Sequence, residues 1–182
     1  MTYKAIIFDL GSVIFSAGFL GYGIFSKAGD IWNLAKVNEI SCDEMYSLIS
    51  KRIDMNKEKL KDLFLTKNEL LPKIKELIIK LSEKYKIGFL TNIIEDVYNK
   101  DLQLWNFEEV GPVVASFIDK VKKPDTNAID LIIKKLKIDK SDVIFIDDNR
   151  NTVEKYNKYG VKSIKYNNYE NLIQNLKELG IK

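Results

Sequence analysis

The sequence predicts an α/β fold in which helices cover both faces of a parallel sheet. Short, nearly continuous apolar runs recur along the chain, and such runs are typical of strands buried on both faces. Between the runs, apolar residues repeat at the 3.6-residue spacing of amphipathic helices. One long segment after the first run has no strand pattern. Together these observations predict a Rossmann-like parallel sheet with helices on both faces, plus a small helical cap inserted after the first strand.

Five apolar runs are the candidate strands. The first begins at Tyr3 and ends at Phe8, where Asp9 and then Gly11 indicate a tight turn. The other four are residues 87–90, 113–115, 143–146 and, as a weaker candidate, 161–164. Helices are expected where apolar residues recur at helical spacing, over residues 74–85, 129–136 and 172–179.

Residues 16–72 interrupt the strand–helix alternation. They begin with a stretch rich in glycine and aromatic residues and continue as helical pieces. Ser41 and Glu44 form a capping box at the start of one helix, and a second helix is expected over residues 57–65. The segment ends at Pro72, which suits the first turn of the next helix.

We therefore expect an α/β core domain formed by residues 1–15 and 73–182, and a helical cap formed by residues 16–72. In the alternative, the helices of this segment simply pack on the sheet. Four of its aromatic residues either line a ligand pocket or belong to the core, and the core is the interpretation we favour for them: Phe19, Tyr22, Phe25 and Trp32.

The composition excludes several classes of function. The 182 residues include 29 basic and 26 acidic side chains, and the net charge of +3 is too small to indicate a nucleic-acid or membrane partner. Because there is no histidine, Ser-His-Asp and Cys-His catalysis and histidine-based zinc sites are excluded within this chain. Cys42 is the only cysteine, so no internal disulfide can form.

The sequence also gives an expectation about location. The apolar run at the N-terminus is too short for a signal peptide, and no stretch approaches the roughly 18 uninterrupted apolar residues of a membrane span. We therefore expect a cytoplasmic protein. No pattern in the sequence specifies an oligomeric state, and a monomer is the default expectation.

Polar residues gather at the carboxyl ends of the predicted strands, namely Asp9, Thr91, Asn92, Ser116, Asp147 and Asp148. In an open α/β sheet this edge is where ligands bind. Carboxylates beside a buried strand are costly unless a cation, hydrogen bonds or a ligand compensates them. Taken singly, each residue is better explained as a helix cap or turn former. Their joint order along the chain, with Lys123-Pro124 among them, favours a common site.

Four motifs in this order resemble those of the haloacid dehalogenase superfamily of aspartate-nucleophile phosphotransferases. They are the segments 6–13 (IIFDLGSV), 89–92 (FLTN), 123–124 (KP) and 145–149 (FIDDN), and the resemblance spans essentially the whole chain. The first and last motifs are most similar to those of a bacterial subgroup that contains a glucose-1-phosphate phosphatase. Residues 38–41 (NEIS) resemble the cap signature of that subgroup.

The resemblance implies a nucleophile and a metal site. Asp9 would attack phosphorus and form an aspartyl-phosphate. Asp9 and Asp148 would supply carboxylates to Mg²⁺, and the main-chain carbonyl of Gly11 would supply a third oxygen. Asp147 would either bind the ion directly or support a ligand.

The resemblance also implies groups that bind the phosphate. Thr91 would donate a hydrogen bond to a phosphoryl oxygen, with the neighbouring Asn92 in the same motif. Lys123 would offset the negative charge of Asp9 and of the phosphate. Lys122 competes for this role, but the lysine of the family motif directly precedes a proline, which identifies Lys123.

One position departs from the usual pattern of the phosphatases. Most of them carry a second aspartate two residues after the nucleophile, where it acts as general acid and base, and here that position is Gly11. General acid–base catalysis contributes typically about 10²–10⁴-fold in rate. The resembling subgroup has the same glycine, so the departure is compatible with slow turnover, with a proton donor from the cap, or with lost activity.

Three functions remain open at the level of the sequence. The first is a Mg²⁺-dependent phosphatase acting on small phosphate monoesters, with a small phosphorylated metabolite, such as a sugar phosphate, as its substrate. The second is a metal-independent haloacid dehalogenase using the same nucleophile, against which Asp147 and Asp148 argue. The third is a non-catalytic or regulatory binding domain on the same fold.

Overall fold

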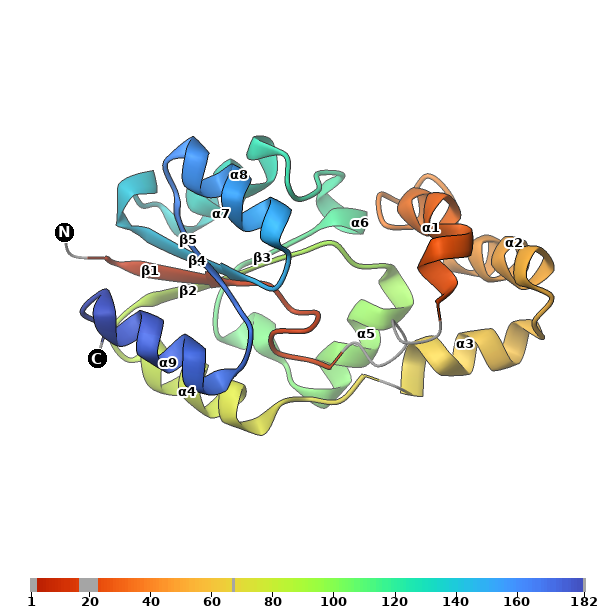
Figure 1. Ribbon diagram of the computed structural model, residues 1–182, viewed down its shortest axis with the longest axis horizontal. Coiled ribbons are helices and arrows are strands. Elements are labelled where there is room, and N and C mark those ends of the chain that lie inside the picture. The colour runs from red at the N-terminus through yellow and green to blue at the C-terminus, as the bar shows by residue number, and fades with distance from the viewer. Residues whose placement is uncertain (1–2, 17–22, 67, 182) are drawn as a thin grey trace.

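The computed structural model describes residues 3–16, 23–66 and 68–181. Within these residues five strands form one parallel sheet in the order β3-β2-β1-β4-β5 (Figure 1). Their bounds are β1 Ala5–Phe8, β2 Lys86–Thr91, β3 Val113–Ala115, β4 Val143–Asp147 and β5 Lys162–Lys165. The predicted α/β fold is confirmed, and each predicted strand is present with small differences at its ends.

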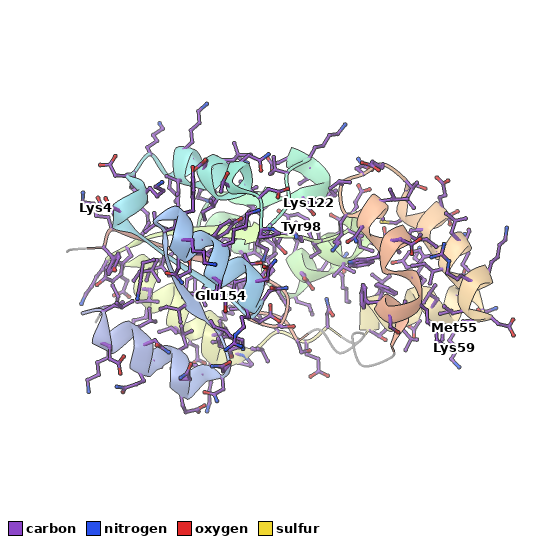
Figure 2. All side chains as sticks on the ribbon, turned by 45° about the horizontal axis from the view of Figure 1, so that its top comes forward. Lys4, Met55, Lys59, Tyr98, Lys122 and Glu154 are labelled. Atoms are coloured by element: carbon purple, nitrogen blue, oxygen red, sulfur yellow. The ribbon has the colours of Figure 1, made fainter. Side chains whose placement is uncertain are left out.

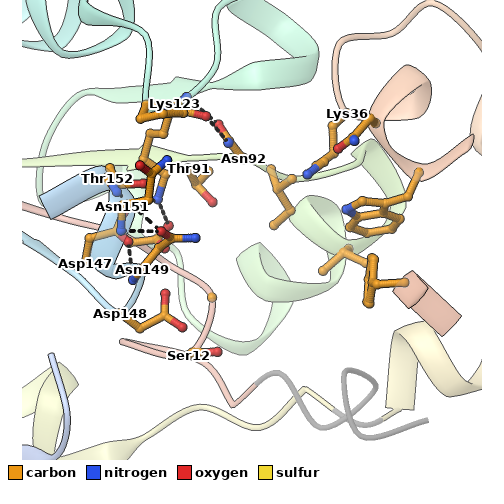
Figure 3. Close-up of a pocket in the computed structure, with 18 of the residues that line it drawn as sticks. Ser12, Lys36, Thr91, Asn92, Lys123, Asp147, Asp148, Asn149, Asn151 and Thr152 are labelled. Atoms are coloured by element: carbon orange, nitrogen blue, oxygen red, sulfur yellow. Dashed lines mark hydrogen bonds and ion pairs between the residues drawn. The ribbon is translucent and has the colours of Figure 1, made fainter. Parts of the chain in front are cut away.

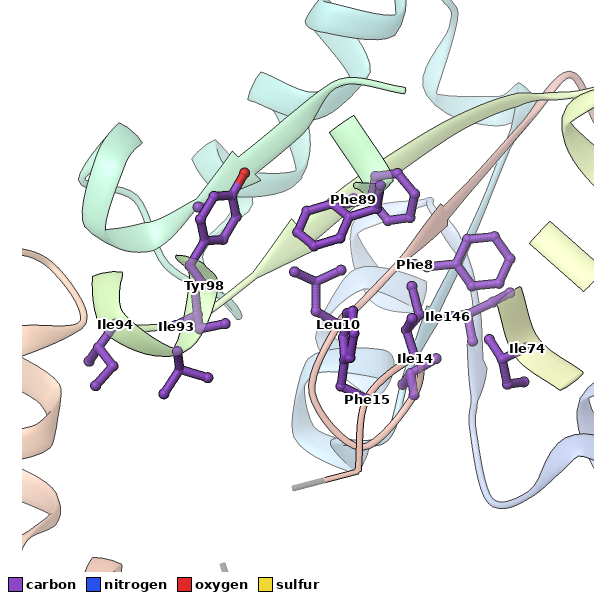
Figure 4. Packing of buried hydrophobic residues seen from close by; sticks show 14 of the residues in the cluster. Phe8, Leu10, Ile14, Phe15, Ile74, Phe89, Ile93, Ile94, Tyr98 and Ile146 are labelled. Atoms are coloured by element: carbon purple, nitrogen blue, oxygen red, sulfur yellow. The ribbon is translucent and has the colours of Figure 1, made fainter. Parts of the chain in front are cut away.

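Helices cover both faces of this sheet (Figure 1). Successive side chains of a strand point to opposite faces, so Ile7 packs with the helices of one layer and Phe8 with those of the other. Figure 4 shows Phe8 close to Ile74 and Ile146, on the face of the sheet opposite to Ile7. The first layer contains α7 (Thr126–Leu136) and α8 (Arg150–Tyr159), and the second contains α4 (Pro72–Ser82) and α9 (Tyr169–Glu178).

Two helices of the core have no counterpart in the sequence prediction. In α5 (Glu95–Leu104) the buried side chains are Val97, Tyr98 and Asp101, so one position of the buried face is a carboxylate. In α8 most side chains are polar, which weakens the apolar repeat. The remaining short helices are α6 Ser116–Asp119, η2 Phe107–Glu109 and η3 Lys140–Asp142. No helix in the described ranges is long and apolar enough to cross a membrane.

Three helices follow β1 and lie together at one end of the molecule (Figure 1). The side-chain hydroxyl of Ser41 accepts a hydrogen bond of 3.1 Å from the main-chain N–H of Glu44, as the predicted capping box requires. Trp32 and Phe64 pack with ring centroids 5.0 Å apart, Phe25 packs against both of them, and Tyr46 packs against Phe64. The three helices are α1 Ile24–Ala35, α2 Cys42–Ile53 and α3 Lys57–Thr66.

The two chain segments that connect these helices to the core run side by side. The N–H of Ser16 donates to the carbonyl of Glu69 at 2.8 Å, and the N–H of Leu71 donates to the carbonyl of Ile14 at 2.9 Å. The side chain of Ser16 also accepts from the N–H of Glu69 at 2.9 Å. The three helices are therefore joined to the core at one place, where the outgoing and returning segments pair.

Candidate active site

A cavity of about 460 Å³ lies at the carboxyl ends of the central strands. Its walls come from both parts of the molecule: the ends of β1, β2 and β4 on one side, and α1 on the other (Figure 3). The parallel register explains why the strand ends meet. Phe8 pairs with Ile146 in the ladder, so Asp9 and Asp147, the next residue of each segment, become neighbours. All seven site residues predicted from the sequence line this cavity: Asp9, Gly11, Thr91, Asn92, Lys123, Asp147 and Asp148.

Asp9 is buried at the end of β1. Its Oδ1 accepts from the N–H of Leu10 at 2.8 Å and lies 2.7 Å from Nζ of Lys123. Burial raises the pKa of Asp9 to about 7; the charge of Lys123 opposes this rise, and the charges of Asp147 and Asp148 add to it. Both short contacts use Oδ1, so Oδ2 is the oxygen that remains for a reaction in the cavity.

Lys123 connects two carboxylates beneath the cavity. Its Nζ lies 2.7 Å from Asp9 Oδ1 and 2.6 Å from Asp147 Oδ2. Burial by itself would lower the pKa of Lys123, but the charges of Asp147 and Asp9 and their hydrogen bonds outweigh it, and the pKa is raised. Lys122, the other candidate for this motif, is exposed (Figure 2). The ammonium group that faces the predicted nucleophile is thus that of Lys123.

Asn92 fixes the main chain of this lysine. Its Nδ2 donates to the carbonyl of Lys123 at 2.8 Å, and its Oδ1 accepts from the N–H of Lys123 at 2.8 Å. The side chain that the sequence placed among the phosphate ligands is therefore engaged with the protein, and the position of Lys123 depends on it. Thr91, at the end of β2, is buried and lines the cavity.

The three carboxylates of the site form a candidate cation site. Asp9, Asp147 and Asp148 each offer an oxygen, and these oxygens lie within 4.8 Å of one another. Burial, and then the charge of Asp147, raise the pKa of Asp148. With one ammonium group among three carboxylates, the fully ionised cluster carries an excess of two negative charges. A divalent hard cation would balance this excess, so the donor set fits Mg²⁺.

Asp147 differs from its neighbours in that both of its oxygens already have partners. Oδ2 contacts Nζ of Lys123, and Oδ1 accepts from the N–H of Asn149 at 2.7 Å. Asn149 caps α8, since its side chain accepts from the N–H groups of Asn151 and Thr152 at 2.9 and 3.3 Å. Of the two roles left open for Asp147, these contacts favour that of a residue which holds Lys123 and the loop after β4.

Gly11 lies in an open part of the turn after β1. Its φ is outside the left-handed region, and a Cβ built on it would have no atom within 4 Å. The positive φ of this turn belongs to Ser12, at 59°. A side chain at position 11 would therefore extend into free space without straining the backbone.

Ser116 is the one strand-end residue of the sequence prediction that is not in the cavity lining. It is buried, and its hydroxyl accepts from the N–H of Ile93 at 3.0 Å and donates to the carbonyl of Ile93 at 3.3 Å. Its role is to hold the turn after β2. Of the aromatic residues considered above, Phe25 and Trp32 line the cavity and also pack with each other, while Phe19 and Tyr22 lie outside the described residues.

Several polar residues of the cavity were missed by the sequence reasoning, and three of them are charged or form a buried pair. Lys36, directly after α1, faces the site from the helical segment, and burial, followed by repulsion from Lys123, lowers its pKa to about 8. Asn68 and Asp101 form a buried pair in the same cavity. Asp101 could have been found from the sequence, because it follows Val97 by four residues and so lies on the same buried face of the helix, where a carboxylate is unusual. Lys36 carries no such signal, because its neighbours become close only in the folded chain.

Comparison with known proteins gives a family and a set of structures with the same fold. Residues 6–166 match the sequence model of a family described as haloacid dehalogenase-like hydrolase. No curated protein matches the chain. A predicted HAD-like family hydrolase from Porphyromonas gingivalis superimposes with a TM-score of 0.79 and 18% identity, over 100% of both chains.

Two further structures in this group differ in what they bind. A HAD family enzyme from Bacteroides thetaiotaomicron, in complex with magnesium and inorganic phosphate, has a TM-score of 0.77 and 16% identity, over 91% of this chain and 94% of that one. The L-2-haloacid dehalogenase from Xanthobacter autotrophicus, with chloropropionic acid covalently bound, has a TM-score of 0.70 and 14% identity, over 100% of this chain and 85% of that one. At these identities the likeness establishes a shared fold and leaves the reaction open.

Proposed function

The chain belongs to the haloacid dehalogenase-like hydrolase family, and we propose that it is a Mg²⁺-dependent phosphatase that hydrolyses small phosphate monoesters through an aspartyl-phosphate on Asp9. The observation that carries this proposal is the charge pattern beneath the cavity. A buried carboxylate that lines the cavity lies beside a fixed ammonium group and two further carboxylates. This arrangement suits a reaction that needs a nucleophile and a neutralised phosphate, and little else.

Asp9, Asp148 and the carbonyl oxygen of Gly11 are the groups we assign to the metal. Bound there, Mg²⁺ would neutralise charge on the phosphate and on the attacking carboxylate. Asp147 is assigned to positioning, because Lys123 and Asn149 occupy its two oxygens. The Bacteroides structure with magnesium and phosphate supports a metal of this kind on the same fold.

The proposed reaction has two chemical steps, formation of an acyl phosphate and its hydrolysis. Oδ2 of Asp9 attacks phosphorus, the P–O bond to the alcohol breaks, and an acyl phosphate forms. Water next attacks this phosphorus, inorganic phosphate leaves, and the carboxylate is regenerated. Lys123 and the hydroxyl of Thr91 stabilise charge on the phosphoryl oxygens. Because Asn92 and Asp147 hold Lys123 in place, its ammonium group needs little reorganisation during the reaction.

We further propose that the substrate is a small phosphorylated metabolite of the cytoplasm, and that sugar phosphates deserve the first tests. The motif similarity to the subgroup with a glucose-1-phosphate phosphatase supports this choice. The low net charge gives no support for a nucleic-acid substrate.

A dehalogenase is the second candidate, because a haloacid dehalogenase shares the fold and covalent chemistry at an aspartate would serve both reactions. The excess negative charge of Asp147 and Asp148 argues against it. A 2-haloacid carries its own carboxylate, which this cluster would repel unless a cation were bound.

The test is hydrolysis of p-nitrophenyl phosphate and of a panel of sugar phosphates, with Mg²⁺ and with EDTA. We expect phosphate release that requires Mg²⁺ and is abolished in Asp9→Asn. Asp62→Asn, which neutralises an exposed carboxylate on α3, is the matched control and should keep full activity. Chloride release from 2-chloropropionate without metal would identify the dehalogenase instead, and no release from any compound would identify a binding domain.

A further inference from the structure

We propose that Lys36 is the general acid that protonates the oxygen of the leaving alcohol. The carboxylate that does this in most phosphatases of the family is replaced here by Gly11. The inference rests on the proposed function, since it assumes that Asp9 attacks a phosphate ester. It adds the residue that completes the reaction and the helix that carries it, α1.

Lys36 lies at the end of a row of residues that face the cavity. The lining residues from α1 and the position after it are Phe25, Gly29, Trp32, Asn33 and Lys36, at the spacing of one helix face. The main-chain N–H of Lys36 donates to the carbonyl of Trp32 at 3.0 Å, which fixes the start of the lysine side chain. Within this row, Lys36 alone has a side chain that can release a proton near neutral pH.

The wall formed by α1 is the side toward which the leaving group points. In phosphoryl transfer the attacking and the leaving oxygen lie roughly in line, on opposite sides of phosphorus. Asp9 attacks from the strand ends, so the leaving oxygen points away from them. Figure 3 shows Lys36 across the cavity from Thr91 and Asp147, which end β2 and β4. Lys36 is therefore on the side of the phosphate where the alcohol departs.

The ammonium group of Lys36 is available to a ligand. Its Nζ lies 5.8 Å from the centre of the Trp32 ring, and it has no carboxylate partner among the residues that the structure describes. The side chain is half-buried, and a charge that is withdrawn from water without a counter-charge is costly. A substrate oxygen that gains negative charge would provide the missing partner.

The electrostatic surroundings of Lys36 agree with a proton donor near the phosphate. Burial lowers its pKa to about 8; repulsion from Lys123 and Lys122 adds to this effect, and attraction by Asp9 opposes it. Because the charges of Lys123 and Asp9 act on it, Lys36 lies near the phosphate end of the cavity. A pKa close to the working pH suits a general acid.

The other titratable residues of the described cavity lining do not suit this role, namely Asp9, Asp101, Lys123, Asp147 and Asp148. Asp9 is the nucleophile, and Asp147 and Asp148 surround the cation site. Two carboxylates hold the proton of Lys123 and raise its pKa. Oδ1 of Asp101 accepts from Asn68, and its Oδ2 is buried out of reach of the cavity.

The proton is returned in the second step, so the cycle balances. As the P–O bond breaks, its electron pair stays on the leaving oxygen, which takes a proton from Nζ of Lys36 and departs as the alcohol. Water then attacks the acyl phosphate from the side that the alcohol has left. The neutral amine of Lys36 takes a proton from this water, and the ammonium group is restored.

The experiment compares benzyl phosphate with p-nitrophenyl phosphate, two esters with one aromatic ring each. Benzyl alcohol needs a proton to leave, whereas p-nitrophenolate leaves without one. We expect Lys36→Gln to lower the ratio of their kcat/KM values, benzyl over p-nitrophenyl, by about 10²–10⁴-fold, the usual contribution of a general acid. Lys27→Gln, which removes an exposed lysine from the same helix, should leave the ratio unchanged.

Lys36→Arg separates proton transfer from charge. Its guanidinium group stays positively charged and does not release a proton, so this variant should lose the ratio as Lys36→Gln does. Lys36→Met, with a side chain of similar length and no charge, repeats the test should Lys36→Gln fail to fold.

Three outcomes would overturn the inference. A parent-like ratio in Lys36→Arg would mean that charge alone is needed. An equal loss for both esters in the variants would mean that Lys36 only binds the phosphate or supports the fold. A parent protein that hydrolyses p-nitrophenyl phosphate and leaves benzyl phosphate intact would have no general acid. If the parent hydrolyses neither ester with Mg²⁺, the proposed function fails, and this inference fails with it.

Discussion

Lys123 shows how the site is prepared before any substrate binds. Its side chain is buried with two carboxylate partners at 2.7 and 2.6 Å, and the amide of Asn92 holds its main chain from both sides. The main-chain N–H of Leu10 donates a hydrogen bond to Asp9, and that of Asn149 donates one to Asp147. Asp9, Lys123 and Asp147 are therefore each held by at least one short hydrogen bond, which is the condition for electrostatic catalysis without reorganisation.

Asp148 is the residue we expect to decide metal affinity. Its carboxyl is only partly buried, and the charge of Asp147 disfavours its ionised form. Asp148→Ala should abolish measurable Mg²⁺ binding in calorimetry, while the apo protein keeps its stability because a repulsive charge has been removed. Asp62→Asn serves as the control. Unchanged Mg²⁺ affinity in Asp148→Ala would refute the assignment.

In the proposed phosphatase reaction, Gly11 determines how the leaving group obtains its proton. With no carboxylate at this position, the alcohol departs largely unprotonated or takes a proton from water or from the helical segment, so good leaving groups should be favoured strongly. Gly11→Asp should flatten the dependence of the first step on leaving-group pKa and accelerate alkyl esters by up to about 10²–10⁴-fold. The structure allows this change, since a Cβ at position 11 meets no atom within 4 Å.

The matched control for this change is Gly11→Asn, which adds a side chain of the same shape with no acidic group. It should keep the steep dependence of the parent. If Gly11→Asp folds, binds Mg²⁺ and shows the same slope as Gly11→Asn, another residue already acts as the acid.

Asp101 should make stability depend on pH. Burial raises its pKa from 3.8 to about 7, so between these values the folded protein holds a proton that the unfolded chain has released. The free energy of unfolding should therefore fall as the pH rises from about 4 to 7, by up to about 4 kcal/mol from this group. Asp101→Asn should reduce this slope, measured by denaturant unfolding of the apo protein. A residual slope is expected from Asp9, whose pKa is raised in the same direction. Parallel pH profiles for the parent and the variant would contradict the prediction.

At the scale of elements, the parallel register places the chemistry. β1 pairs with β2 and with β4, so the segments that follow these three central strands emerge at one edge of the sheet. Each is followed by a tight turn or a helix start, and the buried polar side chains at these points, Asp9, Thr91 and Asp147, line one cavity. The same edge receives α1 from the helical segment, which brings Trp32 and Lys36 to the cavity.

Gly111, just before β3, shows how closely these elements pack. A Cβ at this position would lie 2.0 Å from the main-chain oxygen of Ile87 in β2, and backbone cannot give way as a side chain can. Gly111→Ala should therefore lower the free energy of unfolding by at least about 2 kcal/mol. Gly11→Ala, with free space around its Cβ, should show no such loss in the same denaturant experiment. Equal stabilities of the two variants would mean that the β2–β3 contact is looser than described.

At the scale of the whole molecule, we propose that residues 16–72 act as a lid over the strand ends. The two connecting segments pair at Ser16 and Glu69, and we expect the helices to move about this place. The cavity is bounded by both parts, and closing it would exclude water from the phosphate and strengthen each charge interaction there.

Mg²⁺ with orthovanadate, a phosphate mimic, should then slow amide hydrogen exchange in α1, whose residues line the cavity. Amides of α9, which packs on the sheet away from α1–α3, serve as the internal control (Figure 1). Asp9→Asn should weaken the response. Equal exchange with and without the ligands would indicate a fixed helical layer.

The sequence by itself determined the strands, most of the helices and the identity of the charged residues at the strand ends. It could do so because these features are local: a strand buried on both faces must be apolar along its length, and its end is the first place where a polar residue is tolerated. The prediction missed α5 and α8 because it depended on such local apolar patterns. Their buried faces include Asp101 and Thr152, so the apolar repeat is too weak to read.

The tertiary structure decided what each charged residue contacts. It placed Lys123 between two carboxylates, turned Asn92 toward the main chain of Lys123, and brought Lys36, Asn68 and Asp101 into the same cavity. None of these contacts is local, since Asn68 and Asp101 are 33 residues apart and Asn92 and Lys123 are 31 apart. Periodicity records which side of an element is buried. How the elements pack decides which distant side chains meet in the interior. It therefore also decides which carboxylate is paired and which is free to react.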